Sequence, residues 1–371
     1  MIASLPPELN DHILDYLHKD SRSLGACALT CRAWLATARY HRFRDLRVET
    51  DAKLTALRDL VAPSPALGLV VRRLRIYNSI SPLRCSKFPS LPALTTLVLC
   101  GCGFRLGDLA GIGVKLPALQ ELSMSLCGVD LDALAEFLSS ISGLTIFSLA
   151  QSHLIQPLYD GVPVVGHLDS LRTLRLDNSG LPRGKRTYYG PVDWFVSTLQ
   201  PQQIQTLHVI HLADPRSIPV QPLFDTFGPG SLEHLFLGLY FFSDAATIGF
   251  TLEPCVNLRT IELGHFTNQE SDPRVLKWPS VLISQLNSPS LETLTLTMGT
   301  RPLSPRSNWQ FKDFRALEWQ SIVSTLRRPT LQNLKEFRIH GRGDKASLEA
   351  HLKEMCRDAY EQGLFRLVQQ D

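Results

Sequence analysis

Several features that would assign this chain to a common class are missing from its sequence. No stretch of the 371 residues approaches the run of about 18 apolar residues that a membrane-spanning helix needs, and no Asn-x-Ser/Thr sequon occurs. Residues 1–17 carry prolines and acidic side chains where a secretory signal needs a basic start and an unbroken apolar run. We therefore expect a cytoplasmic or nuclear protein, or one found in both compartments, with no membrane partner.

The sequence also lacks an excess of one charge. Lys and Arg total 38 against 35 Asp and Glu, which gives a formal net charge of +3. This balance argues against general attraction to nucleic acid, so we expect no nucleic-acid partner. Hydrophobic residues make up 44% of the chain, which is enough to bury a substantial core and excludes a fully disordered protein.

Catalytic and metal-binding motifs are absent as well. The sequence has no GxSxG, HExxH or dinucleotide-binding fingerprint, and its eight cysteines form no paired CxxC arrangement. Cys100 and Cys102 are separated by one residue, and Cys27 and Cys31 share a predicted helix face, so buried reduced thiols explain them more simply than zinc. We expect no enzymatic activity, no cofactor and no metal, although a site assembled only in the fold would escape this reasoning.

The sequence does contain a repeat. The pattern L-x-x-L-x-L recurs ten times between residues 71 and 340. Its copies begin at residues 71, 94, 119, 144, 171, 204, 232, 258, 291 and 334. The alternation at the end of each copy predicts a β-strand, and the stretches 131–141 and 319–326 have the apolar spacing of helices. A parallel sheet with crossover helices is the economical chain path for that order.

The repeat resembles that of the leucine-rich-repeat family, whose consensus places Asn or Cys three residues after the last leucine. Cys102 and Cys127 fill that place in two copies. The resemblance implies an α/β solenoid, with a curved parallel sheet and outer helices. We place the array at residues 71–343. We expect the tail, residues 344–371, to form one capping helix from Ser347 to Val368, because an array end needs a cover.

The first 45 residues have no such repeat. Pro6 and Pro7 can open a first helix, on which Leu9 and Ile13 belong to an apolar stripe, and two further helical patterns cover residues 23–30 and 32–40. So small a unit has more apolar faces than it can bury alone. We expect residues 46–70 to form a helical connector into the array.

These first residues resemble the F-box, with matches at Leu5, Pro6, Glu8, Leu9, Ile13, Leu14, Leu17, Cys31, Arg32 and Trp34. The resemblance implies a three-helix F-box over residues 1–45 that binds a Skp-type adaptor and, through it, a cullin scaffold. The adaptor-binding residues that it implies are Leu5, Pro6, Ile13, Leu14, Leu17, Leu24, Leu29 and Trp34.

An F-box ahead of leucine-rich repeats is typical of the substrate-recognition subunit of a Skp–cullin–F-box ubiquitin ligase, with an unknown protein substrate on the repeats. Three alternatives remain. The helices are a cap on the solenoid, or the chain is a scaffold bound to the adaptor without a cullin, or it is a secreted or surface leucine-rich-repeat recognition module. The missing signal peptide and sequons oppose the third alternative.

Strand side chains that alternate with the buried leucines are the candidates for substrate binding. We expect the greatest contact potential at Arg175, His208, His234, Phe236, Glu262 and Arg338, because aromatic and arginine side chains dominate interface energetics. The alternative is that they are solvated strand residues. A basic stretch at residues 180–191, GLPRGKRTYYGP, is either a grip for an acidic or phosphorylated segment or an exposed insertion.

Overall fold

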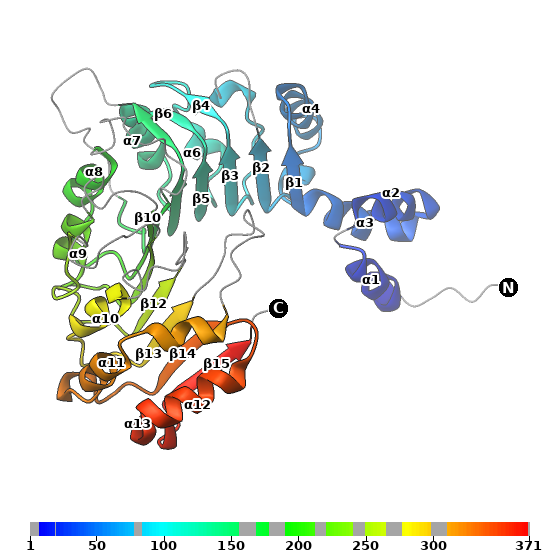
Figure 1. Ribbon diagram of the computed structural model, residues 1–371. Helices are drawn as coiled ribbons and strands as arrows, with labels where there is room; N and C mark the ends of the chain where they lie inside the picture. Colours follow the sequence, from blue (N-terminus) through cyan, green and yellow to red (C-terminus); the bar gives the residue numbers. More distant parts are fainter. Residues whose placement is uncertain are drawn as a thin grey trace. The chain divides into compact units, whose positions relative to one another are not determined.

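The computed structural model describes residues 7–18, 20–77, 84–155, 168–177, 190–211, 220–239, 249–264, 277–297 and 310–369 (Figure 1). The chain forms two compact units, one of Met1–Thr145 with Val165–Leu168 and the other of Ile146–Val164 with Asp169–Asp371. In each unit, parallel strands and helices alternate along the chain. The predicted fold class, a short helical unit followed by an α/β repeat array with a parallel sheet, is confirmed.

Three short helices open the first unit. They are α1 (Pro7–Tyr16), α2 (Ser21–Thr30) and α3 (Arg32–Arg44), as the three apolar patterns predict. The Asp20 carboxylate caps α2 by accepting hydrogen bonds from the amides of Arg22 and Ser23, both at 3.1 Å. The Thr37 hydroxyl of α3 donates to the Asp11 carboxylate of α1 at 2.6 Å, and α3 also packs against α2. Helix α3 therefore joins the other two.

Parallel strands of the first repeats complete this unit. They lie in the order β1 (Asp45–Val48), β2 (Arg73–Tyr77), β3 (Thr96–Cys100) and β5 (Glu121–Ser125), and the short strands β4 (Gly103–Phe104) and β6 (Gly128–Asp130) pair separately. The leucines are in phase, because Leu46, Leu74, Leu97 and Leu122 are successive register partners. The connecting helices are η1 (Cys85–Lys87), α4 (Asp51–Val61), α5 (Pro65–Gly68), α6 (Ile112–Lys115) and α7 (Leu131–Ser139).

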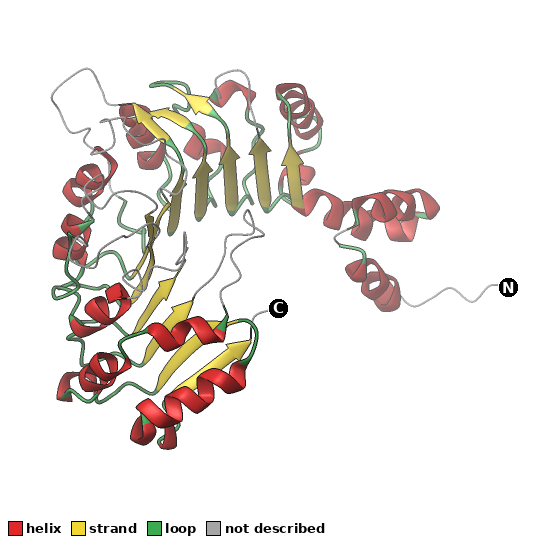
Figure 2. Cartoon of the chain, in the orientation of Figure 1, coloured by secondary structure: helices red, strands yellow, loops and turns green. Residues whose placement is uncertain are grey.

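The second unit continues the same plan. Its strands are β7 (Ile146–Ala150), β8 (His153–Ile155), β9 (Thr173–Asp177), β10 (Thr206–His211), β11 (His234–Leu239), β12 (Thr260–Gly264), β13 (Thr293–Thr297), β14 (Glu336–Gly341) and β15 (Phe365–Gln369). Its helices are α8 (Gly190–Thr198), α9 (Gln221–Phe227), α10 (Lys277–Ser284), η4 (Phe311–Ala316), α11 (Trp319–Leu326), η5 (Pro329–Leu331), α12 (Lys345–Met355) and α13 (Arg357–Glu361). Figure 2 shows α8 to α11 gathered on one side of these strands.

All ten copies of the repeat form strands, and each strand begins two residues after the start of its copy. The carbonyl that precedes a strand accepts two amides from the next copy. Arg72 accepts from Thr95 at 2.9 Å and Thr96 at 3.0 Å, and Glu233 accepts from Arg259 at 2.7 Å and Thr260 at 3.0 Å. The pattern L-x-x-L-x-L thus fixes both the buried face and the backbone pairing of each strand.

The two consensus cysteines lie where the strands turn outward. The Cys127 thiol is 3.3 Å from the Ser125 carbonyl oxygen and 3.6 Å from that of Leu99, and Cys102 makes the equivalent contacts one repeat earlier. Burial raises the pKa of Cys127 to about 12, so this thiol stays protonated at neutral pH and is a structural side chain.

The array extends beyond both predicted boundaries. Strand β1 pairs with β2, so the expectation that residues 46–70 are only a helical connector is wrong for the first of them. The connector itself is helical, with α4 and α5 in it. This copy has the spacing of the repeat pattern at Phe43, Leu46 and Val48, but two of its three positions are not leucine. A search for leucine alone therefore missed it.

The tail differs from the single predicted helix. Helix α12 ends at Met355 and α13 follows it. Gly363 then adopts a left-handed φ of 73° just before β15, which pairs with β14 as a further parallel strand.

 Glycine adopts this left-handed conformation without strain, which allows the chain to turn from α13 into the strand. Phe365 then packs against Trp319 and Phe337, at ring-centroid distances of 5.9 and 5.4 Å. This apolar contact explains why the tail adds a strand.

Candidate functional site

The three N-terminal helices share a small core. Leu14, Leu24 and Ala38 are almost completely buried, and one comes from each helix. Leu17, Cys27, Ala28 and Trp34 pack against this core while staying partly exposed. His41 of α3 lies 2.8 Å from the Asp15 carboxylate of α1. The helices therefore form a defined unit with an interior of its own.

Large apolar side chains remain on the surface of this unit. Leu9, Ile13 and Tyr16 are 49%, 41% and 79% exposed, and their spacing puts them on one face of α1. Leu29 of α2 is 90% exposed. Exposed apolar side chains that gather on one small unit are typical of an interaction surface. We call Leu9, Ile13, Tyr16 and Leu29 the apolar docking set.

The structure describes six of the eight predicted adaptor-binding residues. Ile13 and Leu29 are exposed, and Leu17 and Trp34 are partly buried against the core. Leu14 and Leu24 lie inside the core, so we correct their predicted role from contact to support. Leu5 and Pro6 lie outside the described residues. Sequence reasoning left Leu9 and Tyr16 out of the predicted site, although their helical spacing from Ile13 was a usable signal.

Five of the six predicted substrate-binding residues lie in one row across the second unit. Arg175, His208, Phe236 and Glu262 are successive register partners on β9 to β12. The row continues through Thr295 on β13 to Arg338 on β14. His234 lies two residues before Phe236 on β11, in the neighbouring row. The structure thus brings these side chains together on one sheet, and their binding role remains a prediction.

Contacts within the chain already engage several of these side chains. The rings of His208 and Phe236 meet edge to face, with centroids 3.9 Å apart. His234 Nδ1 lies 2.8 Å from the Thr260 hydroxyl. Glu262 accepts a hydrogen bond from the Thr297 hydroxyl at 2.7 Å. The sheet therefore holds these side chains in place before any partner arrives.

Arg338 differs because it has an acidic partner in its own strand. Its guanidinium lies 2.6 Å from a carboxylate oxygen of Glu336, whose other oxygen is 3.2 Å from Arg366. The hydrogen bond from Arg338 holds the pKa of Glu336 below its usual value. Much of the charge of Arg338 is thus neutralised within the chain, which weakens the case for it as a recognition residue.

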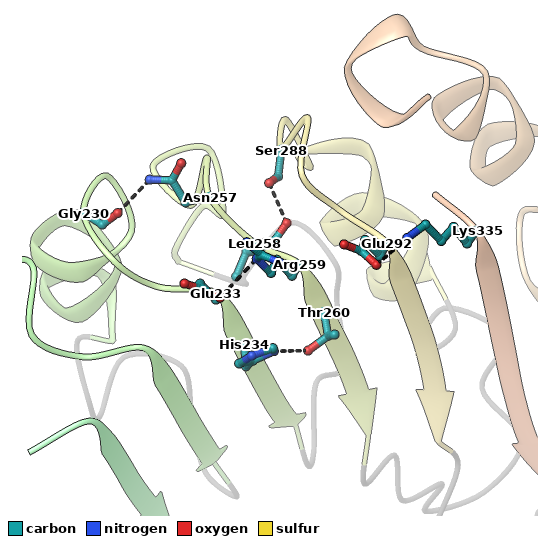
Figure 3. Close-up of polar contacts among 10 residues, drawn as sticks. All are labelled: Gly230, Glu233, His234, Asn257, Leu258, Arg259, Thr260, Ser288, Glu292 and Lys335. Atoms are coloured by element: carbon teal, nitrogen blue, oxygen red, sulfur yellow. Dashed lines mark hydrogen bonds and ion pairs between the residues drawn. The ribbon is translucent and has the colours of Figure 1, made fainter. Parts of the chain in front are cut away.

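Charged side chains also alternate along the amino ends of the strands (Figure 3). Arg259 lies 3.1 Å from Glu233, and Lys335 lies 2.7 Å from Glu292. Both pairs are exposed to solvent, where such a pair contributes about 0.2–1 kcal/mol. Opposite charges on successive repeats therefore balance each other along this edge.

A further basic surface appears on β1 and β2. Arg75 lies 2.8 Å from the Asp45 carboxylate, and the Arg47 guanidinium lies 4.5 Å from the centre of the Tyr77 ring. Sequence reasoning missed this surface because it missed β1. The basic stretch predicted at residues 180–191 lies outside the described residues except for Gly190 and Pro191.

The described residues contain neither a cluster of metal ligands nor a helix that could span a membrane. In that part of the chain no group of three or more His, Cys, Asp or Glu residues is arranged to hold a metal ion. No helix among the same residues is long and apolar enough to cross a membrane.

Comparisons with known proteins concern both parts of the chain. The family model for the F-box-like domain matches residues 2–43, whereas no curated protein matches the sequence. A chain of the TLR13–ssRNA13 complex is similar at 16% identity over 90% of this chain and 52% of that one, with a TM-score of 0.34. The leucine-rich repeat domain of the type III effector XopL is similar at 16% identity over 82% of this chain and 91% of that one, with a TM-score of 0.24. This chain spans about half of the TLR13 chain, and neither structural likeness carries an argument about function.

Proposed function

We propose that this F-box/leucine-rich-repeat protein is the substrate-recognition subunit of a Skp–cullin–F-box ubiquitin ligase. The apolar docking set binds a Skp-type adaptor, which connects the chain to a cullin, and the repeat sheet binds the protein to be modified. The observation that carries the proposal is the exposed apolar surface of α1 and α2 within the F-box-like domain. The proposal includes a cytoplasmic or nuclear location.

The exposed side chains can supply the energy of such a contact. Complete burial of a large apolar side chain contributes about 1.5–3 kcal/mol. Leu29 is 90% exposed, so nearly all of its surface is available to a partner, whereas Ile13 at 41% offers less than half of its own. The buried core formed by Leu14, Leu24 and Ala38 holds these side chains in position. An interface centred on Leu29 therefore agrees with the structure.

Catalysis in the proposed complex is positional. The chain holds a substrate lysine near a ubiquitin-loaded conjugating enzyme and so raises the effective concentration of the two reactants. The receptor needs no nucleophile of its own for this purpose. The alternative, a scaffold that binds the adaptor without a cullin, uses the same docking surface and differs only in what the adaptor recruits.

A pull-down of the full chain from cell extract tests the proposal. We expect the wild-type protein to retain both adaptor and cullin, and the double variant Ile13→Asp with Leu29→Asp to lose both. Leu69→Asp is the matched control, because Leu69 is 57% exposed in the same unit but lies outside α1–α3. Circular dichroism checks that all three proteins are folded.

The outcomes separate the candidate functions. Retention of adaptor without cullin supports the scaffold. Retention of neither protein by the wild-type chain means that the helices only cap the array, and equal losses in the double variant and the Leu69→Asp control contradict a docking surface on α1 and α2.

A further inference from the structure

One acidic side chain on the strands of the second unit, Glu262, has neighbours that differ from those of Glu233, Glu292 and Glu336. Glu233, Glu292 and Glu336 each have a basic partner in the chain, at 3.1, 2.7 and 2.6 Å. Glu262, on β12 in the same sheet, has the Thr297 hydroxyl as its polar partner and forms no ion pair with any described residue. Its negative charge is therefore balanced by no neighbouring cation in the described part of the chain.

An aromatic ring lies beside this carboxylate. Phe236 is the register partner of Glu262 on β11, and its ring extends across to Gly264, two residues further along β12. A Cβ atom on Gly264 would lie 3.3 Å from the tip of that ring, so glycine leaves the space in which the ring rests. Residues two apart on a strand share a face, which puts the ring next to the Glu262 side chain.

Both groups are held in place by their neighbours. The His208 ring contacts Phe236 from β10, with centroids 3.9 Å apart, and the Thr297 hydroxyl fixes one oxygen of Glu262 from β13. Gly264 leaves room for the Phe236 ring on one side and lies close to the Thr297 backbone on the other. Side chains that are already ordered lose little conformational entropy when a ligand binds, which favours binding.

We propose that Glu262, Phe236 and His208 form a binding site for a lysine or arginine side chain of a partner polypeptide. A carboxylate attracts an ammonium or guanidinium group, and an aromatic ring beside it adds a cation–π attraction. Charge complementarity selects the basic side chain over an acidic or apolar one. The inference names the substrate class of the proposed receptor, so its biological meaning rests on the proposed function, although the binding itself does not.

Peptide selection on the full chain tests this site. The probe is a library of random peptides displayed on phage, selected in parallel on the wild-type protein, Glu262→Gln, Glu262→Lys and the control Glu292→Gln. The control removes the same charge just before β13, at a carboxylate that is paired with Lys335. Glu262→Gln keeps the shape of the side chain and an oxygen that can accept from Thr297, so we expect it to fold.

We expect peptides selected by the wild-type protein and by the control to share a basic residue. Replacing that residue by norleucine should weaken binding to both proteins about ten-fold, and should have little effect on Glu262→Gln. Selection on Glu262→Lys should shift to acidic peptides. Phe236→Leu should lower the affinity of the basic peptides in the same assay, because leucine removes the aromatic ring.

Three results would overturn the site. They are peptides without a common basic residue, the same selection by Glu262→Gln as by the wild-type protein, and failure of the folded wild-type protein to select any peptide. Adaptor retention is measured on the same preparations. A chain that selects basic peptides without retaining adaptor supports the site and contradicts the proposed function, whereas the opposite result contradicts the site alone.

Discussion

Two tryptophans in the second unit offer a matched test of how buried polar groups affect stability. Trp319 of α11 and Trp194 of α8 are each 1% exposed. The indole Nε1 of Trp319 donates to the Phe314 carbonyl at 2.8 Å. The indole Nε1 of Trp194 is buried and has no hydrogen-bond partner among the residues that the structure describes. Replacement by phenylalanine removes the indole N–H in both cases. Loss of this group should lower the stability at Trp319, where it removes a hydrogen bond, and raise it at Trp194, where it removes a buried donor without a partner among the described residues.

The difference between the two replacements follows from hydrogen bonding. Both variants lose a similar ring volume, and this loss largely cancels when they are compared. Trp319→Phe also loses one hydrogen bond, worth about 0.5–1.5 kcal/mol, since the Phe314 carbonyl keeps a second donor in the Leu317 amide. Trp194→Phe removes a buried donor that lacks a partner, and such a group costs about 1–3 kcal/mol. We expect Trp319→Phe to be the more destabilising by about 2 kcal/mol.

Urea unfolding followed by circular dichroism measures this difference, and hydrogen exchange of β9 and β14 shows whether each loss is local. Repeat arrays unfold in parts, so exchange in the neighbouring strand is the more direct comparison. Because the two sites lie on different repeats, the double variant should show additive losses. Equal losses in the two single variants, or a larger loss in Trp194→Phe, would refute the reasoning.

Three further predictions concern other parts of the chain. Leu14→Ala should destabilise the N-terminal helices by about 2–5 kcal/mol in thermal unfolding, whereas Leu29→Ala should leave the melting curve unchanged and weaken adaptor binding. Leu126→Asn should raise the free energy of unfolding, measured by urea titration, by about 0.5–1 kcal/mol, because Leu126 is exposed at a left-handed φ of 54° that asparagine tolerates better. The lowered pKa of Glu336 contributes stability that is present above the usual glutamate pKa and is lost as the pH falls through the lowered value. The free energy of unfolding of Glu336→Gln should therefore fall less steeply than that of the wild-type protein as the pH is lowered through this range.

The sequence predicts the repeats well because their physical requirement is local. Each strand needs buried apolar side chains at fixed positions, and the ten leucine-rich copies meet that requirement. The two end strands, β1 and β15, meet it less obviously. In β1 a phenylalanine and a valine replace leucines, and β15 follows Gln362 where the first leucine of the pattern would stand. Such copies are recognised once the backbone pairing with their neighbours is known.

The division between core and surface in the N-terminal helices was harder to predict. Ile13 and Leu14 are adjacent and equally apolar, yet Ile13 is 41% exposed and Leu14 is completely buried. The packing of α1 against α3 decides which of the two points inward, and that packing depends on residues about 25 positions away, such as Ala38. An apolar stripe in the sequence therefore identifies a helix face without showing how much of that face a neighbour covers.

The two proposed interfaces should differ in how long they persist. The apolar docking set consists of side chains whose exposure to water is unfavourable, and burial of such surface is typical of stable complexes. The row around Glu262 is polar, and its charge speeds association and selects partners more than it prolongs binding. The proposed function requires this difference, because a substrate receptor must stay on its adaptor while successive substrates bind and leave. Replacing Glu262 by a large apolar residue should therefore slow the release of bound protein. It should also remove the selectivity of this site for basic residues.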